Sequence, residues 1–227
     1  TGGPGTGKTH TIVAILEAFL KQSDEDVVIL APTGKAASVL KKRIFNDMSH
    51  LFTPFFDRIE IATLHAYFHL RAHKDPVWED HDLGGKLCIV DEASMIDTDI
   101  WVTLLSAAKN RARLLICGDP YQLPPVEIGS IFAQIVGVLE TFDPTHLAAL
   151  KTSMRTDNKA ILAGAEAVKK GAGIDQIPFE ETVCWEEIIQ QLPAPFIGEV
   201  SAEKIRALFK AMQSFRVLTP LKRGPLG

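Results

Sequence analysis

The stretch GGPGTGKT at residues 2–9 has the spacing G-x-x-x-x-G-K-[ST] and runs directly into a helical pattern at residues 10–21. Glycines let the backbone turn tightly, so that consecutive N–H groups can converge on phosphate oxygens at the positive end of the following helix. Lys8 supplies charge to the outer phosphates, and Thr9 supplies a hydroxyl for Mg²⁺. The residues expected to surround ATP are Gly2, Gly3, Pro4, Gly5, Thr6, Gly7, Lys8, Thr9 and His10.

Apolar runs recur at residues 27–30, 87–90 and 114–117, each followed by Gly/Pro or acidic residues and then by a helical pattern. This alternation predicts a parallel α/β sheet. A helix opened by Asp97, Thr98 and Asp99 is expected to follow the second run. Its predicted buried face carries Ile100, Trp101, Leu104, Leu105 and Ala108.

The composition of the 227-residue chain is that of an ordinary globular protein, with 46% hydrophobic and 23% charged residues and a formal net charge of -4. Its longest apolar run, residues 12–20, is interrupted by Glu17 and falls short of the roughly 20 residues of a membrane span. Three cysteines without metal-like spacing favour a reducing compartment, by default the cytoplasm. The acidity argues against a histone-like partner but leaves room for a locally basic track.

Acidic and amide side chains follow two of the predicted strands. CIVDEAS ends in Asp91 and Glu92, which beside a phosphate loop can hold Mg²⁺ and polarise the attacking water. By themselves, two adjacent carboxylates could equally be an exposed helix-cap pair. In LLICGDPYQLPP, Gln122 follows the next strand end, where an amide can orient water or sense the γ-phosphate.

Seven segments occur in the order found in RecD-like helicases, which the chain resembles over its whole length: GGPGTGKT, APTGKAA, ATLHA, VDEASMID, GDPYQLPPVEIGSIF, LKTSMR and LTPLKRGPLG. The family is the 5′→3′ branch of helicase superfamily one. It includes the RecD subunit of the bacterial RecBCD exonuclease (exodeoxyribonuclease V) and free-standing relatives. The resemblance implies a P-loop NTPase fold with two RecA-like domains, and ATP- and Mg²⁺-driven translocation on single-stranded DNA in recombination and repair.

The resemblance also implies roles for individual residues. Its catalytic set is Lys8, Asp91, Glu92, Gln122 and an arginine finger, Arg155, while Thr9 and Asp91 hold the metal. Its DNA-binding set is Thr33, Lys35, Thr63, His65 and Arg223. Without the resemblance, Thr33 could simply cap a helix and His65 would be a packed histidine. Arg155 and Arg223 could be surface charges.

The expected domains are a first RecA-like domain at residues 1–142 and a partial second one at residues 143–227. A small inserted hairpin is expected at about residues 71–85, with Trp78 as a stacking candidate. Helical patterns at residues 159–170 and 202–212 precede a strand at 215–218. The glutamine-bearing stretch that precedes the phosphate loop in the family is absent, as are its last two motifs. We therefore expect a fragment that does not unwind DNA by itself.

Two other functions remain open at this level. GGPGTGKT also occurs in clamp loaders and protein remodellers, although GDPYQLPP and LKTSMR have no place in those families. A nucleotide-binding assembly module of a larger nuclease, alongside RecB/RecC-like subunits as partners, is the second alternative. The joint presence of Lys8, Glu92, Gln122 and Arg155 argues against such a loss of catalysis.

Overall fold

The computed structural model describes residues 1–68, 83–108, 112–123, 125, 130–154, 159–171, 201–203 and 205–207. They divide into two compact units, Thr1–Lys170 and Gly171–Gly227. The expected domain boundary at residues 142 and 143 stays a prediction. The expected strand at 215–218 and most of the expected hairpin, including Trp78, lie outside the described residues.

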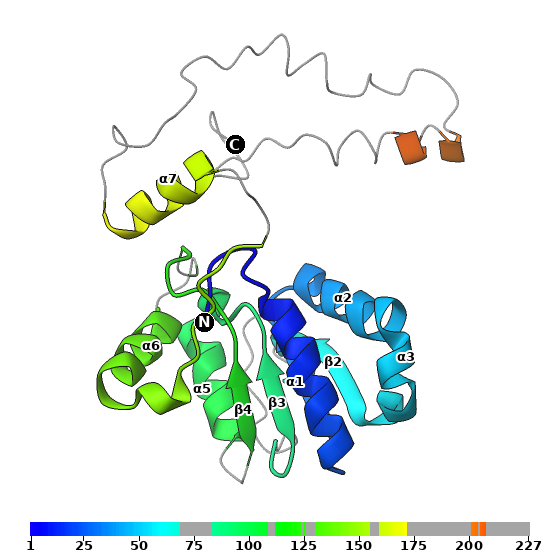
Figure 1. Ribbon diagram of the computed structural model, residues 1–227. Helices are drawn as coiled ribbons and strands as arrows, with labels where there is room; N and C mark the ends of the chain where they lie inside the picture. Colours follow the sequence, from blue (N-terminus) through cyan, green and yellow to red (C-terminus); the bar gives the residue numbers. More distant parts are fainter. Residues whose placement is uncertain are drawn as a thin grey trace. The chain divides into compact units, whose positions relative to one another are not determined.

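A four-stranded parallel sheet with the order β2-β1-β3-β4 forms the centre of the first unit (Figure 1). The strands are β1 (Val27–Ala31), β2 (Ile59–Thr63), β3 (Leu87–Val90) and β4 (Arg113–Ile116). Three of them lie where the apolar runs predicted, and the parallel α/β fold is confirmed. β2 was not predicted.

Helices cover both faces of this sheet (Figure 1). The α-helices are α1 (Lys8–Gln22), α2 (Gly34–Lys42), α3 (Ser49–Phe52), α4 (Leu64–Tyr67), α5 (Thr98–Ala107), α6 (Ile131–Phe142) and α7 (Lys159–Lys169). A π-helical turn, η1 (Arg43–Asp47), and three 3₁₀ turns, η2 (Thr53–Arg58), η3 (Ala93–Met95) and η4 (Pro144–His146), complete the described elements. In the second unit, residues 202–203 and 205–207 are helical, within the expected helix at 202–212.

Side chains that alternate between the two faces of the sheet form two hydrophobic cores. Val27, Ile29 and Ala31 of β1 pack with α1, α2 and α3, whereas Val28 and Leu30 pack with α4, α5 and α6. Successive side chains of a strand point to opposite faces, and β1 is buried along its whole length, as a central parallel strand should be.

One predicted core position in α5 is wrong. Asp97 caps the helix as expected, since its carboxylate accepts a 2.9 Å hydrogen bond from the Ile100 N–H. Leu105, however, is 48% exposed, while Thr103 is 5% exposed. Residues advance by about 100° around a helix, so their order around its axis differs from their order in the sequence. In the order around the axis, the buried arc begins at Thr103 and ends at Trp101, and Leu105 lies just outside it.

The cysteines in and after the strands behave as apolar side chains. Cys88 is fully buried in β3, and its burial raises the pKa of the thiol to about 12. Cys117 follows β4, and burial raises its pKa to about 11. Neither thiol ionises near neutral pH. In the described part of the chain, no helix has the length and apolar character required to cross a membrane.

Candidate nucleotide-binding site

The phosphate loop leads into α1 through two left-handed glycines, Gly5 at φ 75° and Gly7 at φ 91°. Gly7 is the N-cap of α1, and no side chain of the described residues caps this end. A Cβ at Gly7 would meet no described atom within 4 Å, so conformation rather than crowding requires glycine there. The N-terminal amides of α1 are therefore left to a ligand, and the helix dipole favours an anion at this place.

The ammonium of Lys8 lies over the start of its own loop. Its Nζ donates to the Gly2 carbonyl at 2.7 Å and to the Gly3 carbonyl at 3.2 Å. The Thr6 hydroxyl donates to the same Gly3 carbonyl at 2.9 Å. These bonds hold the charge beside the loop, where phosphate oxygens could replace the carbonyls as acceptors.

Two other segments hold the first residues of the loop. The Gly2 N–H donates to the Gly118 carbonyl at 3.2 Å, just beyond β4, and Gly2 forms a parallel bridge with Leu150. Further along, the Met154 N–H donates to the Gly5 carbonyl at 2.8 Å. The start of the loop therefore lies between the end of β4 and residues 150–154.

Asp91 and Glu92 follow β3 directly. The Asp91 N–H continues the ladder by donating to the Leu30 carbonyl at 2.9 Å, and the residue is 6% exposed. Burial raises the pKa of the Asp91 carboxyl above its ordinary value, an effect opposed by the Glu92 N–H and the Lys8 charge. Glu92 itself is left-handed at φ 53°, and its Oε2 is buried with no hydrogen-bond partner among the described residues.

The segment after β4 brings an amide to the same place. Asp119, 2% exposed, accepts hydrogen bonds of 3.1 Å from the Tyr121 N–H on Oδ1 and from the Gln122 N–H on its carbonyl. Gly118 permits this turn to lie close to its neighbours, because a Cβ there would come within 2.8 Å of the Phe132 ring. The turn directs Gln122 toward the phosphate loop.

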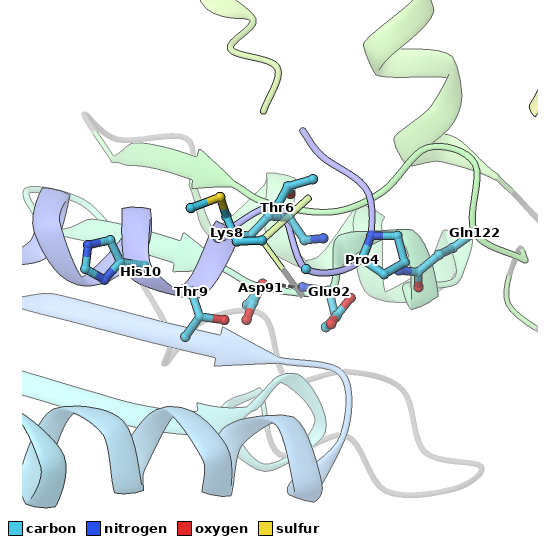
Figure 2. A pocket seen from close by; sticks show the side chains of 11 residues that line it. Pro4, Thr6, Lys8, Thr9, His10, Asp91, Glu92 and Gln122 are labelled. Carbon is cyan, nitrogen blue, oxygen red and sulfur yellow. Dashed lines mark hydrogen bonds between the residues drawn. The ribbon is translucent and has the colours of Figure 1, made fainter. Parts of the chain in front are cut away.

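These groups share one pocket of about 390 Å³, within the usual size range of ligand sites (Figure 2). Its lining residues are Pro4, Gly5, Thr6, Gly7, Lys8, Thr9, His10, Asp91, Glu92, Gln122 and Met154. In Figure 2 the two carboxylates lie between Thr9 and Gln122. Gly2 and Gly3 support the loop without lining the pocket. Met154 was not predicted, and the one signal for it was its position in LKTSMR.

The pocket can accommodate magnesium only with help from a ligand. No group of three or more His, Cys, Asp or Glu side chains gathers into a metal site within the described ranges. Thr9 and Asp91 offer two oxygen-bearing side chains in the pocket, and Mg²⁺ takes few protein ligands when phosphates and water complete its shell. The Glu92 oxygen that has no partner among the described residues likewise fits a site completed by water or nucleotide.

The other predicted residues lie apart from the pocket or outside the described part. Thr33 and Thr63 follow β1 and end β2, at the same carboxyl edge of the sheet, and each caps a helix by accepting from Ala36 N–H and Ala66 N–H respectively. Lys35 and His65 are exposed, so the packed-histidine alternative for His65 is wrong. Arg155 and Arg223 lie outside the described residues.

Comparison with known proteins identifies similar sequences and folds. A family model described as an AAA domain matches residues 1–182. The RecBCD enzyme subunit RecD of Mycobacterium tuberculosis is 34% identical over 185 residues, 76% of this chain and 32% of that protein. The ATP-dependent RecD2 DNA helicase of Deinococcus radiodurans is 27% identical over 230 residues, 100% of this chain and 28% of that protein.

The chain thus spans about a third of the length of the curated relatives that it matches. Among solved structures, the Pif1 helicase from Candida albicans aligns with a TM-score of 0.50 at 20% identity, covering 87% of this chain and 44% of that one. At this identity the likeness concerns the fold alone.

Proposed function

The chain belongs to the AAA-domain family, and from that premise we propose that it is the ATPase core of a RecD-like helicase that moves 5′→3′ along single-stranded DNA. The observation that carries the proposal is the convergence on one pocket of Lys8 at the start of α1, Glu92 after β3 and Gln122 after β4. A phosphate loop alone would support nucleotide binding. The added carboxylate and amide supply what hydrolysis needs.

Each residue of the pocket has a definite task in this proposal. The amides at the start of α1 and the Lys8 ammonium bind the phosphates, and Thr9 with Asp91 would hold Mg²⁺, which offsets charge on the outer phosphates. Glu92 accepts a proton from the attacking water through its Oε2, which no described group occupies with a hydrogen bond. Gln122 orients that water. Arg155 is proposed as the arginine finger on the same phosphate.

The proposed DNA track lies at the carboxyl edge of β1 and β2. Thr33 and Lys35 follow β1, Thr63 ends β2 and His65 follows it, while Asp91 follows the neighbouring β3. The carboxyl ends of parallel strands meet at one edge, where α/β proteins bind their ligands. A change at the nucleotide can therefore reach the track through adjacent strands. Arg223 is proposed as a further contact to the strand.

Strand displacement tests the function directly. The intact protein should displace the duplex strand of a substrate with a 5′ overhang in the presence of ATP, fail on a 3′ overhang, and lose displacement in Lys8→Ala. Single-stranded DNA should stimulate hydrolysis. Hydrolysis without DNA stimulation would instead favour another P-loop ATPase, and tight binding without turnover would favour an assembly module.

We also propose a compartment and partners. Cys88 and Cys117 remain free thiols in the structure, which suits the reducing cytoplasm. RecB/RecC-like subunits are the partners suggested by the relatives named as subunits of the RecBCD enzyme. Co-purification of the native protein with two large subunits would support them, whereas a monomer with full unwinding activity would exclude any need for them.

A further inference from the structure

Helix α7 brings a lysine to the rim of the nucleotide site. Lys169 in its last turn places Nζ 5.2 Å from the centroid of the Tyr121 ring. A methyl group at Gly3 would lie 3.5 Å from the same Nζ and 3.9 Å from Asp119 Oδ2. Lys169 therefore lies against both the phosphate loop and the turn after β4, although the residues that line the pocket do not include it.

The Tyr121 ring belongs to the turn that presents Gln122. The backbone N–H groups of both residues donate to the buried Asp119, at 3.1 Å each. Tyr121 is 66% exposed, so core packing restrains this side of the turn only weakly. An ammonium over the ring, with the Asp119 carboxylate nearby, adds a restraint from a distant part of the chain.

We propose that Lys169 is a positioning residue that holds the Tyr121 ring and thereby fixes Gln122 against the nucleotide. The role of Gln122 in hydrolysis comes from the proposed function, and in that respect this inference rests on it. The contact also gives α7 a means of responding to the nucleotide, because any shift of the Gln122 turn moves the ring on which Lys169 lies. An exposed cation–π contact of this kind changes an equilibrium by about two- to fivefold.

The neighbouring residue provides a matched control. Lys170 carries the same charge one position further along, is 75% exposed and pairs with Glu166 at 3.8 Å. Lys170→Met therefore removes one positive charge from the same end of α7 without touching the Tyr121 contact. Lys169→Arg and Tyr121→Phe are the conservative variants, since each keeps a cation or a ring at its place.

Hydrogen–deuterium exchange of the intact protein tests the contact without any assay of activity. In Lys169→Met, the peptide containing Tyr121 and Gln122 should exchange about two- to fivefold faster, because the turn opens more often. Tyr121→Leu should have the same effect, and the double variant should add nothing. Lys170→Met, Lys169→Arg and Tyr121→Phe should exchange like the wild type. Equal exchange in Lys169→Met and Lys170→Met would overturn the contact.

ATP kinetics test the positioning role. Lys169→Met should lower kcat by about two- to fivefold with KM unchanged, and should have no further effect in a Gln122→Ala background. A change confined to KM, or an undiminished loss of kcat without Gln122, would refute positioning through Gln122. If the wild type shows no DNA-stimulated hydrolysis, the proposed function fails, while the exchange experiment still decides whether Lys169 restrains the turn.

Discussion

The backbone N–H of Glu92 donates to Asp91 Oδ1 at 2.9 Å while Glu92 itself is held in the left-handed conformation, at φ 53°. The two carboxylates therefore have different surroundings although they are adjacent in sequence. Asp91 is tied to the backbone at the end of β3, while Glu92 has a buried oxygen that no described group satisfies. Strain and an unsatisfied acceptor at one residue are features of a site built for a reaction rather than for stability.

Glu92→Gln should bind nucleotide like the wild type but lose hydrolysis by a factor of about 10² to 10⁴, because it removes the base and keeps the size of the side chain. Binding is measured by titration with a fluorescent nucleotide, and turnover by phosphate release. Near-normal steady-state hydrolysis would place the base elsewhere.

Glu92→Gly should make the nucleotide-free protein more stable to urea by about 1 kcal/mol, although it also abolishes hydrolysis. Glycine adopts a positive φ without strain, and the change removes the buried unsatisfied oxygen. The extra freedom of glycine in the unfolded chain offsets part of this gain. Glu92→Gln keeps the strain and serves as the comparison, so a glycine variant less stable than the glutamine variant would contradict the prediction.

Asp91→Asn should raise the free energy of unfolding of the nucleotide-free protein at neutral pH. Burial raises the native pKa of Asp91 above its ordinary value of 3.8, so ionisation disfavours the folded state. The stability that comes from the neutral Asp91 carboxyl is fully present below pH 3.8 and is lost as the pH rises through the raised native pKa. Asparagine avoids this loss and can still accept from the Glu92 N–H.

Urea unfolding of both proteins at a series of pH values measures the effect. The advantage of Asp91→Asn should shrink as the pH is lowered toward 3.8, where the native carboxyl also becomes neutral. An advantage that stays constant with pH would mean that the carboxylate charge is not its cause.

Lys8→Ala should weaken nucleotide binding by at least about tenfold, because a charge-assisted hydrogen bond contributes about 1.5–3 kcal/mol. Lys21→Ala is the matched control, since Lys21 lies in the last turn of the same helix and pairs with Glu17. Isothermal titration with Mg²⁺-ATP distinguishes the two variants. Unchanged affinity in Lys8→Ala would refute the assignment of the phosphate loop.

The parts of the fold that the sequence predicted are those with strong local signals. The runs that form β1, β3 and β4 are apolar and are followed by glycine, proline or acidic residues. Asp97 can be recognised as a helix cap from the residues beside it. β2 lacks such a signal, because it is an edge strand in which Glu60 is exposed between buried Ile59 and Ile61. Its pairing with β1 is a tertiary contact that no short window of sequence contains.

The residues of the site likewise include some that the sequence predicted and some that it did not. Lys8, Asp91 and Gln122 were predictable because each follows a strand or precedes a helix within a recognisable motif. Met154 and Lys169 reach the site through tertiary contacts, such as those with Gly5 and Tyr121, which are far from them in sequence. Such contacts depend on the path by which the chain returns to the sheet. The spacing of apolar residues along the sequence does not specify that path.

Lys35→Ala should weaken binding to single-stranded DNA and lower the slope of log affinity against log salt by about 0.7, the value for one phosphate contact to a single strand. Lys35 is the cleanest probe of the proposed track. It is exposed in the first turn of α2, whereas Thr33 and Thr63 also cap helices, so their removal would destabilise the protein by about 1 kcal/mol each.

Lys86→Ala serves as the control, because Lys86 immediately precedes β3, at the opposite edge of the sheet. Both variants should unfold at the same urea concentration as the wild type, and only Lys35→Ala should change the salt slope on a homopolymeric strand. Since phosphate contacts carry no sequence information, the loss should be equal on strands of different base composition. An equal slope in Lys35→Ala and Lys86→Ala would mean that the strand passes elsewhere.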